Sequence, residues 1–163
     1  MEYTIRKVSI NDIDKVTAVE AQCFPEAEAA GRADFQARIQ AYPDSFFVVE
    51  TTEGKIIGFI NGCVTDDQTI EDEMFEDVSL HNPEGAYQAV FGLDVIEEYR
   101  KQGVAAGLME RLIEEARSCG RKGIILTCKD RLITYYEKYG YRNLGVSKSV
   151  HGGAVWYDMI LEF

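Results

Sequence analysis

A glycine-containing turn between an apolar strand and an amphipathic helix is the part of this sequence best suited to bind an anion. The apolar residues 90–95 lead through a charged turn to Gly103, after which a helical pattern begins. The first N–H groups of a helix have no partner within the helix, and the helix dipole is positive at that end. Gly103 lets the backbone approach a bulky anion, and Ala105 and Ala106 leave that face unobstructed. The stretch predicts a phosphate-binding turn, with an ordinary glycine turn as the alternative.

Several side chains are candidates for moving protons. His81 titrates near neutral pH. Glu73 and Asp77 belong to an acidic segment, residues 66–81, that could attract an amine or simply be a solvated loop. Asp94 lies in an apolar strand, where an unpaired carboxylate is costly. His151 lies in a glycine turn and is expected at the surface. The residues alone do not choose a base among these, and proton transfer through ordered water remains open.

Composition narrows the class of protein. A chain of 163 residues, 46% hydrophobic and 28% charged, is typical of one globular domain spanning residues 1–163. The net charge of −11 argues against a nucleic-acid partner and is compatible with a cationic substrate. No apolar run is long enough for a membrane span, and the first residues do not resemble a signal peptide. The four cysteines lack C-x-x-C spacing, which favours free thiols in a cytoplasmic protein and no metal site.

Alternating and helical patterns divide the chain into strands and helices. The predicted strands are residues 2–8, 45–51, 55–65, 84–95 and 123–128, with a terminal hairpin of residues 141–150 and 154–163. The predicted helices are residues 12–24, with Asn11 or Asp12 as the N-cap, 32–41, 103–119 and 132–138. Gly85 and Gly92 interrupt the strand of residues 84–95, and a glycine within a strand indicates a bulge or a close approach.

Three motifs together resemble a known family. Residues 100–105, Arg-Lys-Gln-Gly-Val-Ala, fit the Arg/Gln-x-x-Gly-x-Gly/Ala motif of the GCN5-related N-acetyltransferases (GNAT). A Leu-x-Val sequence at residues 93–95 precedes this motif, and Tyr-Glu-Lys-Tyr-Gly-Tyr at residues 136–141 follows it. The resemblance implies an α/β protein with a mixed, mostly antiparallel central sheet. In that fold the sheet is splayed at a bulged strand and carries helices on both faces.

The same resemblance implies a site for acetyl-coenzyme A (acetyl-CoA) as cosubstrate. Tyr136 matches the family tyrosine that reprotonates the leaving thiolate, and an aromatic core residue is the alternative reading. The motifs assign cofactor contacts to ten residues: Leu93, Asp94, Val95, Arg100, Lys101, Gln102, Gly103, Val104, Ala105 and Ala106.

Within the family, two segments are similar to the arylalkylamine (serotonin) N-acetyltransferases. These are residues 81–95, with His-x-Pro-x-Gly and Leu-x-Val, and residues 128–137, with Cys-x-Asp-x-Leu-Ile-x-x-Tyr-Glu. His81 matches a histidine of that branch and is our catalytic candidate beside Tyr136. The two strand histidines that serve as proton acceptors in the vertebrate enzymes are here Ala89 and Phe91. The resemblance therefore implies the fold and cofactor more firmly than it implies the amine or the base.

The expected function is acetyl transfer from acetyl-CoA to a primary amine, by direct attack in a ternary complex. A small arylalkylamine is the expected substrate. The alternatives are acetylation of a protein N-terminus or lysine, and a coenzyme A-binding regulatory module without catalysis. No nucleic-acid or membrane partner is expected, and a twofold homodimer is the expectation from its frequency among oligomers.

Overall fold

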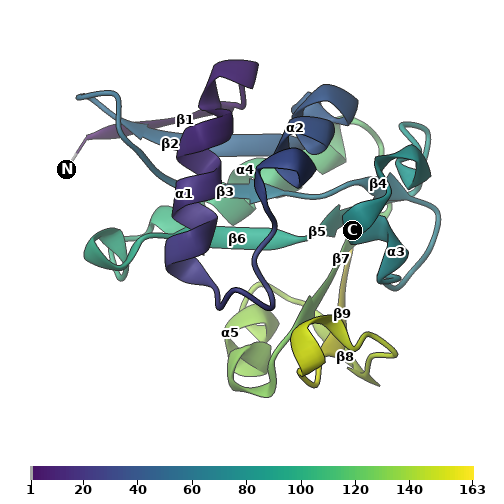
Figure 1. Ribbon diagram of the computed structural model, residues 1–163. Helices are drawn as coiled ribbons and strands as arrows, with labels where there is room; N and C mark the ends of the chain where they lie inside the picture. Colours follow the sequence, from purple (N-terminus) through teal and green to yellow (C-terminus); the bar gives the residue numbers. More distant parts are fainter. Residues whose placement is uncertain (1) are drawn as a thin grey trace.

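The computed structural model describes residues 2–163, which form two adjoining β-sheets (Figure 1). The first sheet is antiparallel and contains β1 (Tyr3–Lys7), β2 (Phe46–Thr51), β3 (Ile56–Asn61) and β6 (Gly92–Val95), in that order. The second sheet has the order β4 (Val64–Thr65), β5 (Tyr87–Val90), β7 (Gly123–Cys128), β9 (Tyr157–Glu162) and β8 (Arg142–Val146). Its one parallel pair joins β5 to β7. The predicted mixed, mostly antiparallel arrangement is confirmed.

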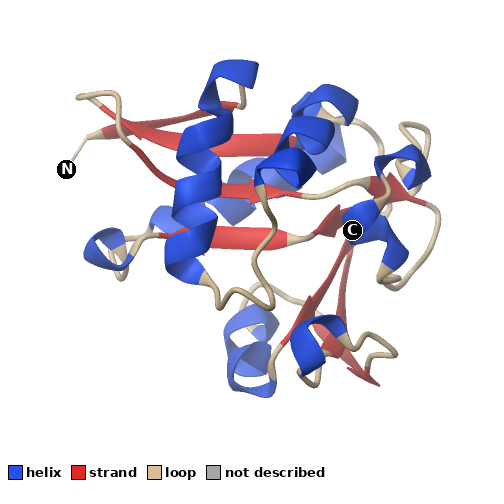
Figure 2. Cartoon of the chain, viewed as in Figure 1, coloured by secondary structure: helices blue, strands red, loops and turns tan. Residues whose placement is uncertain are grey.

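Helices cover both faces of the sheets (Figure 2). Helices α1 (Ile13–Cys23) and α2 (Arg32–Ala41) lie on one face, and α4 (Val104–Ser118) lies behind the strands on the other (Figure 1). The apolar stripe of α4, which includes Leu108 and Leu112, is fully buried, as its 3.6-residue periodicity predicts. The shorter helices are α3 (Glu73–Glu76) and α5 (Ile133–Glu137). Single 3₁₀ turns occupy Ile10–Asp12, Pro43–Ser45, Val78–Leu80, Glu97–Tyr99, Asp130–Leu132 and His151–Gly153.

The chain changes sheets at Phe91. Strand β5 ends at Val90, which pairs with Leu126 of β7, whereas β6 begins at Gly92 and pairs with β3. The two strands that precede and follow Phe91 therefore diverge, and a gap opens between β6 and the end of β7. The buried Gln88 side chain helps to hold this break, because its amide donates to the carbonyls of Gly62 and Ala89 at 2.9 and 2.7 Å. This is the splayed, irregular strand that the family resemblance led us to expect.

Several predicted boundaries were wrong. The segment predicted as one strand, residues 55–65, is divided into β3 and β4. The division lies at Gly62, where an added Cβ would be only 1.8 Å from the Ala89 carbonyl oxygen. Ser9 caps the 3₁₀ turn Ile10–Asp12, because its side chain accepts a hydrogen bond from the Asn11 N–H. Asp12 is the N-cap residue of α1, as predicted, although its side chain makes no capping hydrogen bond. The strand predicted for residues 141–150 ends at Val146.

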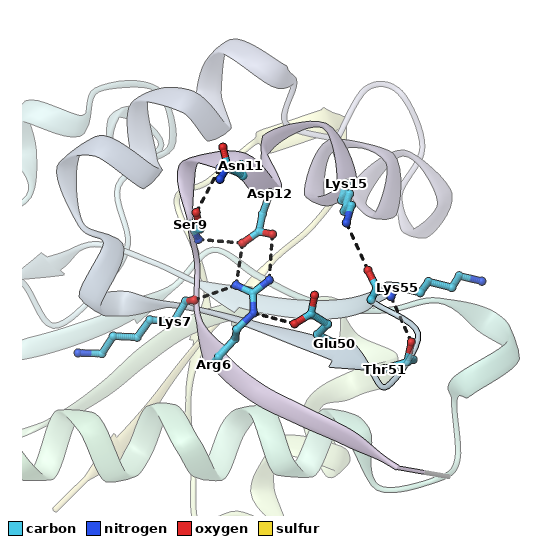
Figure 3. Close-up of polar contacts among 10 residues, drawn as sticks. Arg6, Lys7, Ser9, Asn11, Asp12, Lys15, Glu50, Thr51 and Lys55 are labelled. Atoms are coloured by element: carbon cyan, nitrogen blue, oxygen red, sulfur yellow. Dashed lines mark hydrogen bonds and ion pairs between the residues drawn. The ribbon is translucent and has the colours of Figure 1, made fainter.

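A partly buried ion-pair network fixes the start of α1 against the first sheet (Figure 3). Two guanidinium nitrogens of Arg6, on β1, donate to the two oxygens of Asp12 at 2.9 and 3.0 Å, and its Nε donates to Glu50 on β2 at 3.1 Å. Asp12 also accepts the Ser9 N–H at 2.8 Å. The network sets where α1 begins, and α1 in turn carries residues of the candidate site.

Candidate active site

A cavity of about 590 Å³ lies where the two sheets diverge. The chain between α1 and α2 crosses in front of it, and the short helix α5 and the 3₁₀ turn His151–Gly153 lie beside it (Figure 1). Strand residues at the break form one wall: Val90, Phe91, Gly92, Leu93, Leu126 and Cys128. The elements that create the gap thus also create the cavity.

Tyr136 lines this cavity from α5. Its side chain is 8% exposed and packs edge-to-face against Tyr135 and Tyr141, with ring centroids 5.1 and 5.7 Å away. Burial raises the pKa of the Tyr136 phenol above its ordinary value. The hydroxyl is therefore protonated at neutral pH and able to donate a hydrogen bond to a group in the gap.

Glu20 contributes a carboxylate to the same cavity from α1. Its side chain is buried, and one oxygen, Oε2, accepts the N–H of Ala30 at 2.8 Å. The other oxygen, Oε1, faces Gly92, since an added Cβ on that glycine would lie 3.8 Å from it. Glu20 was missed from the sequence. The available signal was a charged residue four positions after Val16, on the apolar face of the helix.

Aromatic side chains form the far part of the cavity. Phe75 stacks on His151, with centroids 5.0 Å apart and an interplanar angle of 12°, and Phe75 lies 4.7 Å from Phe91. Trp156 donates its indole N–H to the His151 carbonyl at 2.8 Å. The expectation that His151 is a surface residue was wrong, because tertiary packing brings its turn over the cavity.

An ion pair between Lys129 and Glu28 lies in the same part of the cavity lining. Lys129 Nζ lies 2.9 Å from Glu28 Oε2, and the Glu28 side chain is 8% exposed. The second oxygen, Oε1, has no hydrogen-bond partner among residues 2–163. His151 Nε2 lies 2.9 Å from the backbone carbonyl of Glu28. The connection between α1 and α2 is thereby fastened to the C-terminal part of the chain.

The predicted anion-binding turn lies at the opposite end of β6. Lys101 and Gly103 both adopt positive φ, 62° and 82°, and Gly103 caps α4. Arg100 Nε donates to the Val95 carbonyl at 2.7 Å, and Gln102 Nε2 donates to the Glu98 carbonyl at 3.2 Å. Both side chains therefore fold back onto the protein and brace the turn.

The geometry of this turn fits a pyrophosphate. An added Cβ on Gly103 would meet no atom within 4 Å, so the space before the helix is open. The first N–H groups of α4, from Val104, Ala105 and Ala106, point toward that end of the helix. Leu93 lines the cavity, and β6 pairs through one edge with β3, so its other edge faces the gap. An extended ligand could run along β6 from the turn to the cavity.

His81, the predicted catalytic histidine, does not line this cavity. Its Nδ1 accepts the Val64 N–H at 3.0 Å, and its ring packs on Tyr42 at 5.1 Å. Burial, followed by the charge of Arg121, lowers the pKa of His81, so the ring is neutral at pH 7. Among the described residues that line the cavity, neither His81 nor Glu73 nor Asp77 is found. Asp77 instead caps a 3₁₀ turn through Ser79.

Cys128, one of the two cysteines that line the cavity, is a poor nucleophile. Burial raises the pKa of Cys128 to about 11, so the thiol is protonated at neutral pH, whereas the thiolate is the reactive form. All four cysteines are free. No cluster of three or more His, Cys, Asp or Glu side chains within residues 2–163 could hold a metal ion. None of the helices in this part of the chain is long and apolar enough to cross a membrane.

Two curated relatives match much of this sequence. A protein of Bacillus subtilis (strain 168) described as "Probable hydrolase YhcX" is 30% identical over 147 residues, which are 85% of this chain and 28% of that protein. The serotonin N-acetyltransferase of Mesocricetus auratus is 30% identical over 108 residues, 66% of this chain and 51% of that enzyme. The chain thus spans about a quarter to a half of the length of these relatives.

Solved structures share the fold. The "GphF GNAT-like decarboxylase in complex with isobutyryl-CoA" superimposes with a TM-score of 0.83 at 21% identity, covering 98% of each chain. Arabidopsis thaliana Naa50, in complex with the bisubstrate analogue CoA-Ac-MVNAL, gives a TM-score of 0.77 at 14% identity and covers 100% of each chain. The sequence profile described as "Acetyltransferase (GNAT) family" matches residues 13–141, which include the splayed strand, the predicted anion-binding turn and Tyr136. On this evidence the chain belongs to the GNAT family.

Proposed function

We propose that this protein transfers the acetyl group of acetyl-CoA to the nitrogen of a primary amine. The observation that carries the proposal is the pairing of two groups in one cavity at the gap between the sheets. Glu20 supplies a carboxylate from α1, and Tyr136 supplies a protonated phenol from α5. One group is suited to take a proton and the other to give one, which acetyl transfer requires.

The reaction has to move two protons. A primary amine has a pKa of about 10 and reaches the site as an ammonium ion. Glu20 accepts the first proton, which frees the nitrogen lone pair to attack the thioester carbonyl; a C–N bond forms and the C–S bond breaks. The departing thiolate gains a proton from Tyr136, and the second proton lost by the nitrogen restores the Tyr136 hydroxyl. The net products are an amide, a thiol and one proton released to solvent.

Binding of the cosubstrate is assigned to β6 and the turn that follows it. Leu93, Asp94 and Val95 would contribute backbone groups along the gap. The turn from Arg100 to Ala106 would hold the pyrophosphate with backbone N–H groups of the α4 N-terminus. The Val95 carbonyl already accepts a hydrogen bond from Arg100, and the Gln102 side chain donates to the Glu98 carbonyl. We therefore assign these groups to bracing the turn and not to direct contact with the cosubstrate.

An amine that carries an aromatic group is the acceptor best suited to the cavity. Its lining carries four acidic residues, Glu20, Glu28, Asp34 and Glu76, against three basic ones, Arg38, Lys129 and Arg131, and this small acidic excess favours a cation. Its aromatic lining favours a flat apolar body, through Phe24, Phe75, Phe91 and Trp156. The serotonin N-acetyltransferase similarity supports the same class. The structural likeness to Naa50, bound to a peptide-containing analogue, supports a protein N-terminus as the second candidate.

The test is release of coenzyme A from acetyl-CoA, measured with a thiol reagent, across a panel of amines. The panel contains phenethylamine, tyramine, tryptamine and serotonin, with polyamines and short peptides as the competing classes. We expect the highest kcat/KM among the aromatic amines. Preference for peptides would replace the small-amine assignment. Coenzyme A binding by calorimetry without thiol release from any acceptor would favour a regulatory module.

A further inference from the structure

Asp94 is a buried carboxyl group that the structure leaves without a donor. It is 1% exposed, and no N–H or O–H group of residues 2–163 donates to either of its oxygens. It lies on the face of β6 opposite Leu93, toward α1. An ionised carboxylate in such a place, with no donor, is strongly disfavoured.

The group facing Asp94 is a second carboxyl, that of Glu20. An added Cβ on Gly92 would lie 3.0 Å from Asp94 Oδ1 and 3.8 Å from Glu20 Oε1, so the two oxygens converge beside this glycine. Two carboxyl groups can form a hydrogen bond only if one of them carries a proton. Burial, followed by the interaction with the neighbouring Glu20 carboxyl, raises the pKa of Asp94 well above its ordinary value.

The charges around the pair favour a single shared proton. The nearby titratable groups are Cys23 on α1, Arg38 on α2 and Tyr136 on α5. Burial raises the pKa of both Cys23 and Tyr136, so neither carries charge at neutral pH. Arg38 is the cation that acts on Asp94, and Arg100 acts on Cys23 at the edge of the cluster. A cation beside the pair favours one ionised carboxyl over two protonated ones, and burial disfavours two ionised ones.

We propose that Asp94 is a positioning residue that shares one proton with Glu20 and thereby keeps Glu20 an ionised proton acceptor near neutral pH. The inference rests on the proposed function. When the ammonium ion gives up its first proton, Glu20 takes it, and the pair becomes doubly protonated. One proton then leaves to solvent through the cavity that Glu20 lines, and the singly protonated pair is restored. The Asp94 side chain itself contacts neither substrate.

The decisive variant is Asp94→Asn, which keeps the size of the side chain and an N–H donor toward Glu20. An amide N–H donates a weaker hydrogen bond to a carboxylate than a carboxyl O–H does. The acid limb of the kcat/KM profile should therefore move to higher pH by about one pH unit. Asp158→Asn is the control, because Asp158 on β9 is a part-buried aspartate with an unpartnered oxygen whose charged neighbour is Glu71 and not Glu20. It should retain the wild-type profile, and a wild-type profile for Asp94→Asn would overturn the proposal.

Infrared spectroscopy tests the pair without any acetyl transfer. The unliganded wild-type protein at pH 7 should show the C=O stretch of a protonated carboxyl, which Asp94→Asn removes and Asp158→Asn retains. Absence of the band would overturn the shared proton, as would be expected if Asp94 were ionised against Arg38. A wild type that releases no thiol with any amine would refute the proposed function, and the band would still decide whether the pair exists. Glu20→Gln should lower kcat by about 100-fold.

Discussion

At the scale of single residues, Tyr136 and Tyr135 show how position separates two chemically identical side chains. Both belong to α5, but only Tyr136 lines the cavity, whereas the Tyr135 hydroxyl lies 3.0 Å from that of Tyr139. Successive helical residues point about 100° apart, so one tyrosine faces the gap and the next faces its neighbours. The family motif selected Tyr136, and its position in the cavity is consistent with a role on the leaving thiolate.

Replacing Tyr136 by Phe removes the hydroxyl while keeping the ring that packs on Tyr141. We expect kcat to fall by about 100-fold, because a positioned acid contributes that much or more, while coenzyme A affinity stays near the wild-type value. Steady-state thiol release and calorimetry measure the two effects. Tyr135→Phe is the control and should leave kcat within a few-fold of wild type. Equal kcat values for Tyr136→Phe and the wild type would show that Tyr136 only packs in the core.

At the scale of the element, the turn before α4 and the turn after it offer a matched comparison. Gly103 has φ 82° and Gly120 has φ 75°, and an added Cβ on either would meet no atom within 4 Å. Any side chain suffers the same backbone strain at both. The two positions differ in which end of the helix dipole they occupy.

Gly103→Glu should weaken coenzyme A binding by about 100-fold or more, because it sets a carboxylate against the pyrophosphate. Gly120→Glu should bind with wild-type affinity at a similar loss of stability. Isothermal titration calorimetry with coenzyme A measures both. Undiminished affinity in Gly103→Glu would show that the pyrophosphate binds elsewhere.

The attachment of α1 to the first sheet gives a second prediction at this scale. Burial alone would raise the pKa of Asp12, but the Arg6 guanidinium and the Ser9 N–H outweigh it and hold the pKa below its ordinary value. Asp12→Asn should lower the free energy of unfolding by about 2 kcal/mol at pH 7. Because the folded-state pKa is the lower one, this contribution is complete above the unfolded value of about 4 and is lost as pH falls through the folded value.

Urea denaturation at pH 7 and pH 3 measures that loss. Asp44→Asn is the control: Asp44 pairs with Lys7 at 3.1 Å but its side chain is 80% exposed, so its effect should stay below about 0.5 kcal/mol. A pH-independent effect of Asp12→Asn would mean that the ion pair is not its cause.

At the scale of the whole molecule, the two sheets diverge at Phe91, and a ligand lying in the gap would contact both. A ligand that binds only the folded state at 100 times its Kd adds about 2.7 kcal/mol to the free energy of unfolding. For a domain of this size we expect Tm to rise by about 5–10 °C with saturating coenzyme A. Differential scanning calorimetry measures the shift. Gly103→Glu should show almost none, and a wild-type shift in that variant would contradict the assigned site.

Features that depend on short stretches of chain could be predicted from the sequence. Periodicity indicated most strands and helices, and the strand–glycine–helix spacing located the turn before α4. Local geometry fixes these patterns within about twenty residues, so they are readable without the fold. The break at Phe91 was expected from the family resemblance and from glycines at Gly85 and Gly92, although its exact position was not.

Which side chains contact one another depends on tertiary packing and could not be predicted from the sequence. Glu20 and Asp94 belong to elements far apart in the sequence, and their convergence beside Gly92 depends on how α1 packs across β6. The same packing brings His151 over the cavity and leaves His81 outside it. Sequence patterns report whether a side chain is buried, but they do not report what it is buried against, because that depends on long-range contacts. The chemistry of this cavity is set by such contacts.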